Sequence, residues 1–243
     1  MKIAIAGATG LIGSQLTALA RAEGQEVVEI ARETGFDLLR PDGLEAALAG
    51  VDTIVDVTQS PTLEEDEATS FFTTVAGNLG RAATAAGVTR TVVLSIVGVE
   101  DMTDYGYYVA KLAQERAARA AAPGLSILRA TQFHDFAGQM LRWSTQDGVA
   151  HIMDVPTQPV ATAEIVRVLL DLATGAMTGD VELTGPQRIG LVDQVRKLVE
   201  RSGSEVSVEP AEAPPSMAAG AMLPGPHAIV RGPGWDEWLE QSA

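Results

Sequence analysis

The feature that most constrains the fold stands in the first thirteen residues, where a short apolar run leads into three evenly spaced glycines. The apolar run over residues 2–6 predicts a buried strand, and a helical pattern covers residues 11–22. Gly7, Gly10 and Gly13 lie at the junction. A glycine turn between a strand and a helix points backbone N–H groups and the positive end of the helix dipole at one place. The junction therefore predicts a site for an anion such as a pyrophosphate.

Beyond this junction, strand-like and helix-like patterns alternate. Strands are predicted over residues 2–6, 26–30, 53–57, 91–95 and 126–129. Helices are predicted over about 11–22, 41–49, 66–86, 107–121, 162–174 and 190–202. This alternation is typical of an α/β fold, and we expect a doubly wound parallel sheet of the Rossmann type with helices on both faces.

The pattern weakens after about residue 131, where prolines become frequent. We expect one domain over residues 1–243, in which residues 131–160 and 203–243 contribute a small substrate-binding lobe. Such a lobe would lie over the carboxyl ends of the strands, where ligands bind in open α/β sheets. The Ala- and Pro-rich stretch over residues 209–220 is expected to be mobile.

Composition excludes several classes of function. The chain has no cysteine, which excludes disulfides and thiol chemistry. Its net charge of −15 argues against nucleic acid as a partner. There is neither a basic leader followed by an apolar run nor an apolar stretch of about 18 residues, so we expect no signal peptide, no membrane contact and a cytoplasmic location. The histidines are too scattered in the sequence to predict a metal site. We expect a monomer or homodimer that binds a small-molecule substrate.

The end of the second predicted strand bears on which dinucleotide would bind. In NAD-binding sheets, an acid about 20 residues after the glycines holds the ribose 2′-hydroxyl. Arg32 occupies that region here, and an arginine pairs with a 2′-phosphate. This favours NADP(H), with NAD(H) as the alternative, because a shift of one residue would place Glu33 there instead.

A third group of residues predicts proton transfer. Tyr107 and Lys111 are four residues apart, so they share one face of a helix. A nearby ammonium is expected to lower the pKa of the tyrosine. The phenol would then be a usable proton donor to a carbonyl oxygen of the substrate. Ser95, at the end of a predicted strand, would hold that oxygen by a hydrogen bond. Tyr108 is three residues before Lys111 and shares a face with it too, so the spacing leaves two candidates for the functional tyrosine.

Several segments together resemble a known family. They are residues 7–13, 94–99, 107–115, 129–136 and 235–239. On these segments the chain resembles atypical short-chain dehydrogenases/reductases of the NmrA-like, NAD(P)-binding group. The resemblance implies a Rossmann fold, a bound nicotinamide dinucleotide, and catalytic roles for Ser95, Tyr107 and Lys111 as polariser, acid and tyrosine activator.

The resemblance also implies which residues line the cofactor. Besides Ser95, Tyr107 and Lys111, they are Gly7, Ala8, Thr9, Gly10, Leu11, Ile12, Gly13, Arg32, Asp37, Leu38, Val57, Thr58, Gln59, Thr131, Gln132 and Phe133. Asp37 and Leu38 would follow a short third strand. The chain departs from the family pattern at residues 56–59, where Asp-Val-Thr-Gln replaces an Asn-Ala-Gly-type segment.

Three functions follow from these observations. The first is an NADP-preferring oxidoreductase that acts on a carbonyl, a quinone or a related small apolar substrate. Six apolar residues are candidates either for the wall around that substrate or for core packing: Phe133, Phe136, Met140, Met217, Met222 and Leu223. The second is a dinucleotide-binding sensor without turnover. The third, disfavoured by the short C-terminal part, is a sugar-nucleotide epimerase-like enzyme.

Overall fold

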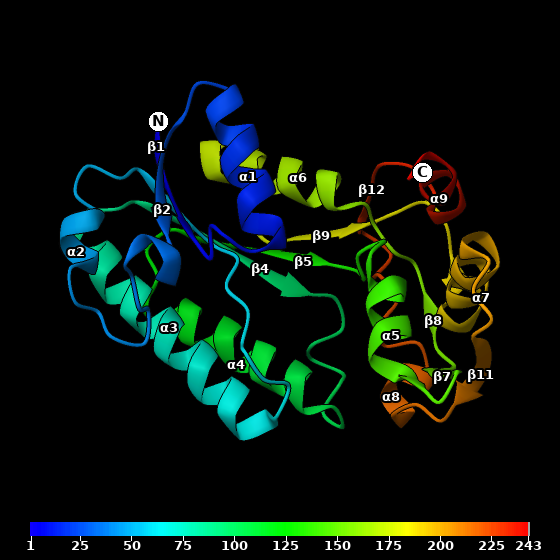
Figure 1. Cartoon of the computed structure of the whole chain (residues 1–243). Coiled ribbons are helices and arrows are strands. Elements are labelled where there is room, and N and C mark those ends of the chain that lie inside the picture. The colour runs from blue at the N-terminus through cyan, green and yellow to red at the C-terminus, as the bar shows by residue number, and fades with distance from the viewer. Residues whose placement is uncertain (243) are drawn as a thin grey trace.

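The computed structural model, which describes residues 1–242, contains one large parallel sheet (Figure 1). Its strands are β1 (Lys2–Ala6), β2 (Glu26–Ile30), β3 (Thr53–Asp56), β4 (Arg90–Ile96), β5 (Leu125–Ala130), β9 (Val181–Thr184) and β12 (Ile229–Val230). Across the sheet they run in the order β12-β9-β5-β4-β3-β1-β2, and every pairing is parallel. The order reverses at β1, which pairs with β2 on one side and with β3 on the other. The predicted fold class, a doubly wound α/β sheet, is confirmed.

Helices cover both faces of this sheet. α1 (Leu11–Ala22) and α6 (Thr162–Thr174) lie on one face, and α3 (Glu65–Ala86) and α4 (Gly106–Ala121) lie on the other (Figure 1). Val92 packs into the core that contains α1 and α6, whereas its neighbour Val93 packs with residues of α3 and α4. A strand buried on both faces needs such a continuous apolar run, so the pattern over 91–95 follows from the fold.

The segment between β2 and β3 differs from expectation. The short third strand expected before Asp37 and Leu38 is not formed; a single 3-10 turn (Arg32–Thr34), further turns and α2 (Leu44–Ala47) stand there. Gly35 adopts a φ of +93°, which ends any extended run. The backbone carbonyl of Leu38 instead accepts a 2.8 Å hydrogen bond from the buried Asn78 side chain of α3.

A smaller lobe with its own apolar core lies beyond the carboxyl ends of the main strands. It is built from α5 (Phe136–Ser144), β6 (Thr145–Gln146), β7 (Val149–Met153), β8 (Pro156–Thr157), β10 (Ile189–Gly190), α7 (Leu191–Ser202), β11 (Ser207–Ala211), α8 (Pro215–Ala218) and α9 (Trp235–Gln241). α7 thus joins the lobe, whereas β12, within the predicted lobe segment 203–243, joins the main sheet. Residues 209–220 hold α8 and the end of β11, which pairs with β7, and their mobility stays a prediction.

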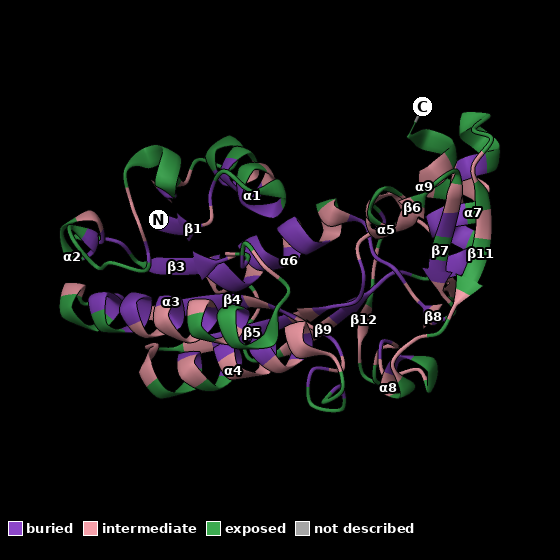
Figure 2. Ribbon diagram, turned by 60° about the horizontal axis from the view of Figure 1, so that its bottom comes forward, coloured by how far each residue is buried: buried purple, intermediate pink, exposed green. Residues whose placement is uncertain are grey.

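The chain's last helix anchors the lobe. Trp235 of α9 is fully buried, and its indole nitrogen donates a 3.2 Å hydrogen bond to the carbonyl of His134. The His134 ring lies 5.1 Å from that of Trp238, and burial lowers the pKa of the imidazole. His134 and Trp235 are therefore packing residues. Figure 2 shows both cores as buried segments flanked by exposed helix surfaces.

The described part of the chain bears on two of the expected absences. Within residues 1–242 no helix combines the length and apolar character that a membrane span requires. Over the same residues no three His, Cys, Asp or Glu side chains gather as a metal site would need. The acidic run Glu64–Glu67 instead begins α3, where carboxylates interact favourably with the helix dipole.

Candidate functional site

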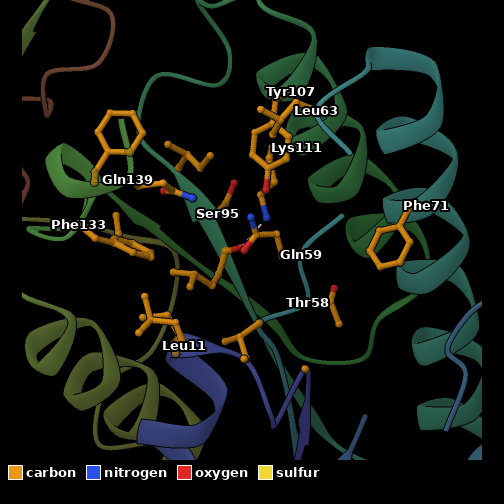
Figure 3. Close-up of a pocket in the computed structure, with 18 of the residues that line it drawn as sticks. Leu11, Thr58, Gln59, Leu63, Phe71, Ser95, Tyr107, Lys111, Phe133 and Gln139 are labelled. Atoms are coloured by element: carbon orange, nitrogen blue, oxygen red, sulfur yellow. Dashed lines mark hydrogen bonds between the residues drawn. The ribbon is translucent and has the colours of Figure 1, made fainter. Parts of the chain in front are cut away.

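A cavity of about 630 Å³ lies at the carboxyl ends of β1 to β5, between the main sheet and the lobe (Figure 3). It opens at the point where the strand order reverses, which is where open α/β sheets bind ligands. The structure places all the predicted site residues on its wall except Ala8 and Gly13. The cavity therefore brings the glycine loop, Arg32, Ser95, Tyr107 and Lys111 to one place.

The glycine loop is shaped by two close backbone approaches. Gly7 has a φ of +84°, and a Cβ on it would lie 2.9 Å from the carbonyl oxygen of Val57. A Cβ on Gly13 would lie only 2.1 Å from the carbonyl oxygen of Gly7, so Gly13 serves helix–strand packing. Gly10 caps α1, and no side chain caps the first-turn N–H groups. Those groups lack acceptors within the helix and are free to bind an anion.

The end of β2 places two opposite charges beside this loop. Both Arg32 and Glu33 line the cavity, just after the buried Ala31. The hydroxyl of Thr9 donates a 2.9 Å hydrogen bond to the Glu33 carboxylate. Hydrogen bonds from its own backbone N–H and from Thr9 hold the pKa of Glu33 below its usual range. Arg32 forms no ion pair among residues 1–242 and remains available to a ligand.

Lys111 lies buried beneath the cavity on α4. Its ammonium donates a 2.8 Å hydrogen bond to the carbonyl of Leu94 and another to the side-chain oxygen of Gln114. It also lies 4.8 Å from the centre of the Phe72 ring, a cation–π contact. Burial lowers the pKa of Lys111 to about 8, although the carboxylates of Asp56 and Glu115 oppose that shift.

Tyr107 stands one turn before Lys111, with its ring packed edge-on against Phe72 at 5.8 Å. The expectation that the lysine lowers the pKa of this tyrosine is wrong: burial, and to a lesser degree Tyr105, raises it to about 12. The reason is geometric, because the Lys111 ammonium is directed to Leu94 and Gln114. The phenol is therefore fully protonated at neutral pH.

Ser95 and Tyr108 complete this part of the wall. The Ser95 hydroxyl is buried and has no hydrogen-bond partner among the described residues. Figure 3 shows Ser95 between Tyr107 and Gln139. Tyr108 also reaches the cavity, but it belongs to the lobe core and packs edge-on against Tyr105 at 5.8 Å. Burial raises its pKa as well.

The segment after β5 has partly structural duties. The hydroxyl of Thr131 donates a 2.7 Å hydrogen bond to the carbonyl of Gln158. The Gln132 amide nitrogen reaches the carbonyl of Met222 at 3.4 Å, while its side-chain oxygen is buried without a partner. Phe133 is half-buried and forms an isolated bridge with Val160. Gln132 and Phe133 thus remain the members of this segment with groups to offer a ligand.

Four exposed apolar side chains line the cavity, and the sequence indicated only one of them. Leu11, Leu39, Leu63 and Trp143 are 41–54% exposed, and all four line the cavity. Exposed large apolar residues that gather at one cavity mark a binding surface. Only Leu11 was expected here, because an isolated Leu or Trp in a sequence indicates core packing as readily as ligand contact.

Other lining residues divide between expected and unexpected. Phe133, Phe136, Met140, Met217 and Met222 line the cavity, as expected, whereas Leu223 does not. Glu33 and Tyr108, the alternatives to Arg32 and Tyr107, also line it. The unexpected lining residues are Ile30, Ala31, Phe36, Leu39, Leu63, Phe71, Leu94, Ile96, Tyr105, Ala130, Gln139, Arg142, Trp143 and Met153. Asp56 and Gln114, which contact Lys111 directly or through one another, were also missed. Gln114 had a signal, since it lies three residues after Lys111 on the same helix face.

Comparison with known families decides the assignment. The model of the NAD dependent epimerase/dehydratase family matches residues 3–129, more than half of the chain. The chain belongs to this family. The match supports the expected membership of an NAD(P)-binding family at this broader level, whereas the NmrA-like group stays a prediction.

Individual relatives within and around this family are distant. A dTDP-4-dehydrorhamnose reductase of Mycobacterium tuberculosis (strain CDC 1551 / Oshkosh) is 26% identical over 235 residues, which covers 84% of this chain and 76% of that protein. The dTDP-4-dehydrorhamnose reductase of Bacillus anthracis str. Ames, solved with NADP, superposes with a TM-score of 0.75 at 16% identity, covering 99% of this chain and 97% of that one.

A third similar protein is also a reductase, but its name refers to triphenylmethane and not to dehydrorhamnose. The Citrobacter sp. triphenylmethane reductase, solved with NADP(H), has a TM-score of 0.67 at 22% identity and covers 87% of this chain and 80% of its own. At these identities the two structures establish the fold that this member of the epimerase/dehydratase family shares with them.

Proposed function

We propose that this protein is an NADPH-dependent reductase of a carbonyl group in a small molecule, with Tyr107 as the proton donor. One observation carries the proposal: a single cavity joins the glycine loop to Ser95, Tyr107 and Lys111. A dinucleotide suits the residues present, because a Cβ at Gly7 or Gly13 would collide with the loop and the N–H groups of α1 are open to a pyrophosphate.

The chemistry divides between the cofactor and the chain. A bound reduced nicotinamide supplies the hydride that the carbonyl carbon accepts. Ser95, whose buried hydroxyl has no partner, donates a hydrogen bond to the carbonyl oxygen. Tyr107 transfers its phenolic proton to that oxygen as negative charge develops there, so the product is the alcohol. Lys111 adds a buried positive charge one helical turn from Tyr107, with its ammonium directed to Leu94 and Gln114.

The substrate wall supports a small apolar carbonyl compound or quinone. Phe136, Met140, Met153, Met217 and Met222 face the cavity, and methionines and aromatic rings adapt well to flat apolar ligands. Among the described residues, Arg142 is the one cation that the lobe contributes to the cavity wall. We place the chain in the NmrA-like group on the strength of residues 94–99, 107–115 and 129–136.

A second candidate substrate comes from the names of the relatives. Two of the proteins described above are dTDP-4-dehydrorhamnose reductases. On that ground the second candidate is a dTDP-linked 4-keto sugar, for which the exposed Trp143 would stack on the base and Arg142 would bind the diphosphate. The same reduction step applies to both candidates.

The test is a titration with NADPH and NADH, followed by NADPH oxidation with three substrate sets. The sets are quinones, aromatic carbonyl compounds and dTDP-4-dehydrorhamnose. Turnover of the first two supports the apolar substrate, and turnover of the last alone supports the sugar nucleotide. Tight NADPH binding with no turnover in any set overturns the reductase and supports the dinucleotide sensor.

A further inference from the structure

The buried ammonium of Lys111 has no direct carboxylate partner within residues 1–242. Instead the Gln114 side chain stands between it and Asp56: the amide oxygen accepts from Lys111, and the amide nitrogen donates a 2.9 Å hydrogen bond to Asp56. The opposite amide orientation would turn N–H groups toward the ammonium and oxygen toward the carboxylate. The charges on both sides therefore fix the orientation of this glutamine.

The other carboxylate oxygen of Asp56 holds the loop that follows β3. It accepts hydrogen bonds from the backbone N–H of Thr58 at 2.9 Å and from the Thr58 hydroxyl at 2.7 Å. That loop carries Val57, Thr58 and Gln59 to the cavity wall and packs against Gly7. One carboxylate thus joins the lysine to the wall of the dinucleotide groove.

The remaining charges around Lys111 are already paired. Glu115, on the same helix, is buried and accepts two hydrogen bonds from Arg129 of β5, at 2.9 and 2.7 Å. From α3 the lysine meets the Phe72 ring, and from its own helix Tyr107 precedes it by one turn. Within residues 1–242, Asp56 is the carboxylate near Lys111 that forms no ion pair with another cation. All three groups of the network, Lys111, Gln114 and Asp56, are at most 4% exposed.

We propose that Gln114 and Asp56 are positioning residues that keep Lys111 protonated and fixed beneath the site, although neither donates to substrate. This inference deepens the proposed reductase function and rests on it for its catalytic meaning. In physical terms, the protonation state of the active-site lysine depends on a carboxylate two hydrogen bonds away. The replacement of the Asn-Ala-Gly-type segment by residues 56–59 then has a purpose, since it supplies that carboxylate.

The direct test observes the lysine itself. The chain contains three lysines, Lys2, Lys111 and Lys197, so labelling with [ε-¹³C]lysine gives an NMR spectrum of three signals, and Lys111→Met identifies the buried one. In the wild type the Lys111 signal is expected to titrate at a midpoint near pH 8. Gln114→Met and Asp56→Asn are each expected to lower that midpoint by about one pH unit, because the charged form loses its partners.

A matched control separates this effect from general loss of packing. Gln194 of α7 is equally buried and donates a 2.6 Å hydrogen bond to Thr157, far from Lys111 in the lobe. Gln194→Met should leave the Lys111 midpoint unchanged. If Gln114→Met also leaves the Lys111 midpoint unchanged, the proposal is overturned. Because Gln114→Met removes no charge, it remains informative even if Asp56→Asn fails to fold.

Activity supplies an independent readout. With any substrate that the wild type reduces, the alkaline limb of kcat should move to lower pH in Gln114→Met by the same interval as the NMR midpoint, with KM for substrate unchanged. A shifted NMR midpoint in a protein that reduces nothing sinks the reductase function but leaves the network intact. If Gln114→Met leaves the NMR midpoint unchanged in a protein that reduces a substrate, the proposed network is overturned and the reductase function stands.

Discussion

Thr9 and Glu33 tie the glycine loop to the segment after β2 through one 2.9 Å hydrogen bond. The neighbouring Arg32 has no such tie and lines the same cavity. Two opposite charges therefore compete for the ribose end of a dinucleotide, and the hydrogen bond engages the acid. We therefore expect Arg32, rather than the engaged acid, to contact the ribose end of a dinucleotide, which predicts a preference for NADPH.

Cofactor choice gives the first prediction. Arg32→Ala should weaken NADPH binding by about 10- to 100-fold, the value of a charge-assisted hydrogen bond of roughly 1.5–3 kcal/mol, and leave NADH binding unchanged. Glu33→Gln should improve NADPH binding relative to NADH, because it removes a negative charge near the phosphate. Isothermal titration of both variants with both dinucleotides measures this. An equal loss for NADPH and NADH in Arg32→Ala would contradict it.

The proton donor gives the second prediction. Tyr107→Phe removes the phenol and should lower kcat by about 10²- to 10⁴-fold with little change in NADPH affinity. Tyr108→Phe is the matched control: its ring packs in the lobe core, so we expect most of the turnover to remain. Steady-state kinetics on the substrate found in the panel compares the two. Full turnover in Tyr107→Phe would assign the proton to another group.

The glycine loop gives the third prediction. Gly13→Ala would place a Cβ 2.1 Å from the Gly7 carbonyl oxygen, so the backbone must move, at a cost of about 1–3 kcal/mol. We expect a lower Tm and loss of dinucleotide binding together. Gly77→Ala on α3 is the control, because its Cβ would meet only the flexible end of Arg81 at 3.3 Å. There alanine should be neutral or stabilising, and an equal loss of Tm in both variants would refute the steric argument.

The buried lysine gives the fourth prediction, on stability against pH. Its pKa falls from 10.5 in the unfolded chain to about 8 in the fold, so the unfolded chain binds more protons between these two values. Stability from this group therefore rises with pH across that window, by at most about 3 kcal/mol.

Urea denaturation at pH 7.5 and pH 10 tests the sign. The free energy of unfolding of the wild type, relative to Lys111→Met, should increase between the two pH values. Lys2→Met, which removes a surface ammonium paired with Glu26, should show no comparable change. A relative decrease for Lys111 would mean that its charged form is the favoured one in the fold.

The sequence predicted those parts of the molecule in which local pattern and tertiary environment agree. The runs at β1 and β4 are apolar because those strands are buried on both faces, and the glycines are required by backbone contacts. The lobe was harder to predict, because β6, β8 and β10 are two residues long and carry no periodic signal. The short strand predicted before Asp37 is not formed, because Gly35 has a positive φ and the Leu38 carbonyl is bonded to Asn78.

At the site, residue identity was predictable and electrostatics was not. The spacing of Tyr107 and Lys111 put them on one helix face, but the direction of the ammonium depends on Gln114 and Asp56. Asp56 is 55 residues before Lys111 in the chain, and only the pairing of β3 with β4 brings it near. No local pattern carries that information.

The path of the chain through the lobe limits how this protein can be altered. After β8 the chain returns to the main sheet for α6 and β9, goes back to the lobe for β10 to α8, returns to the sheet for β12, and ends in the lobe with α9. Because the lobe is built from several separate segments of the chain, it cannot be exchanged by replacing one continuous segment. Replacements on the cavity wall avoid this difficulty, and the adaptable methionines there are the positions at which to begin a change of substrate range.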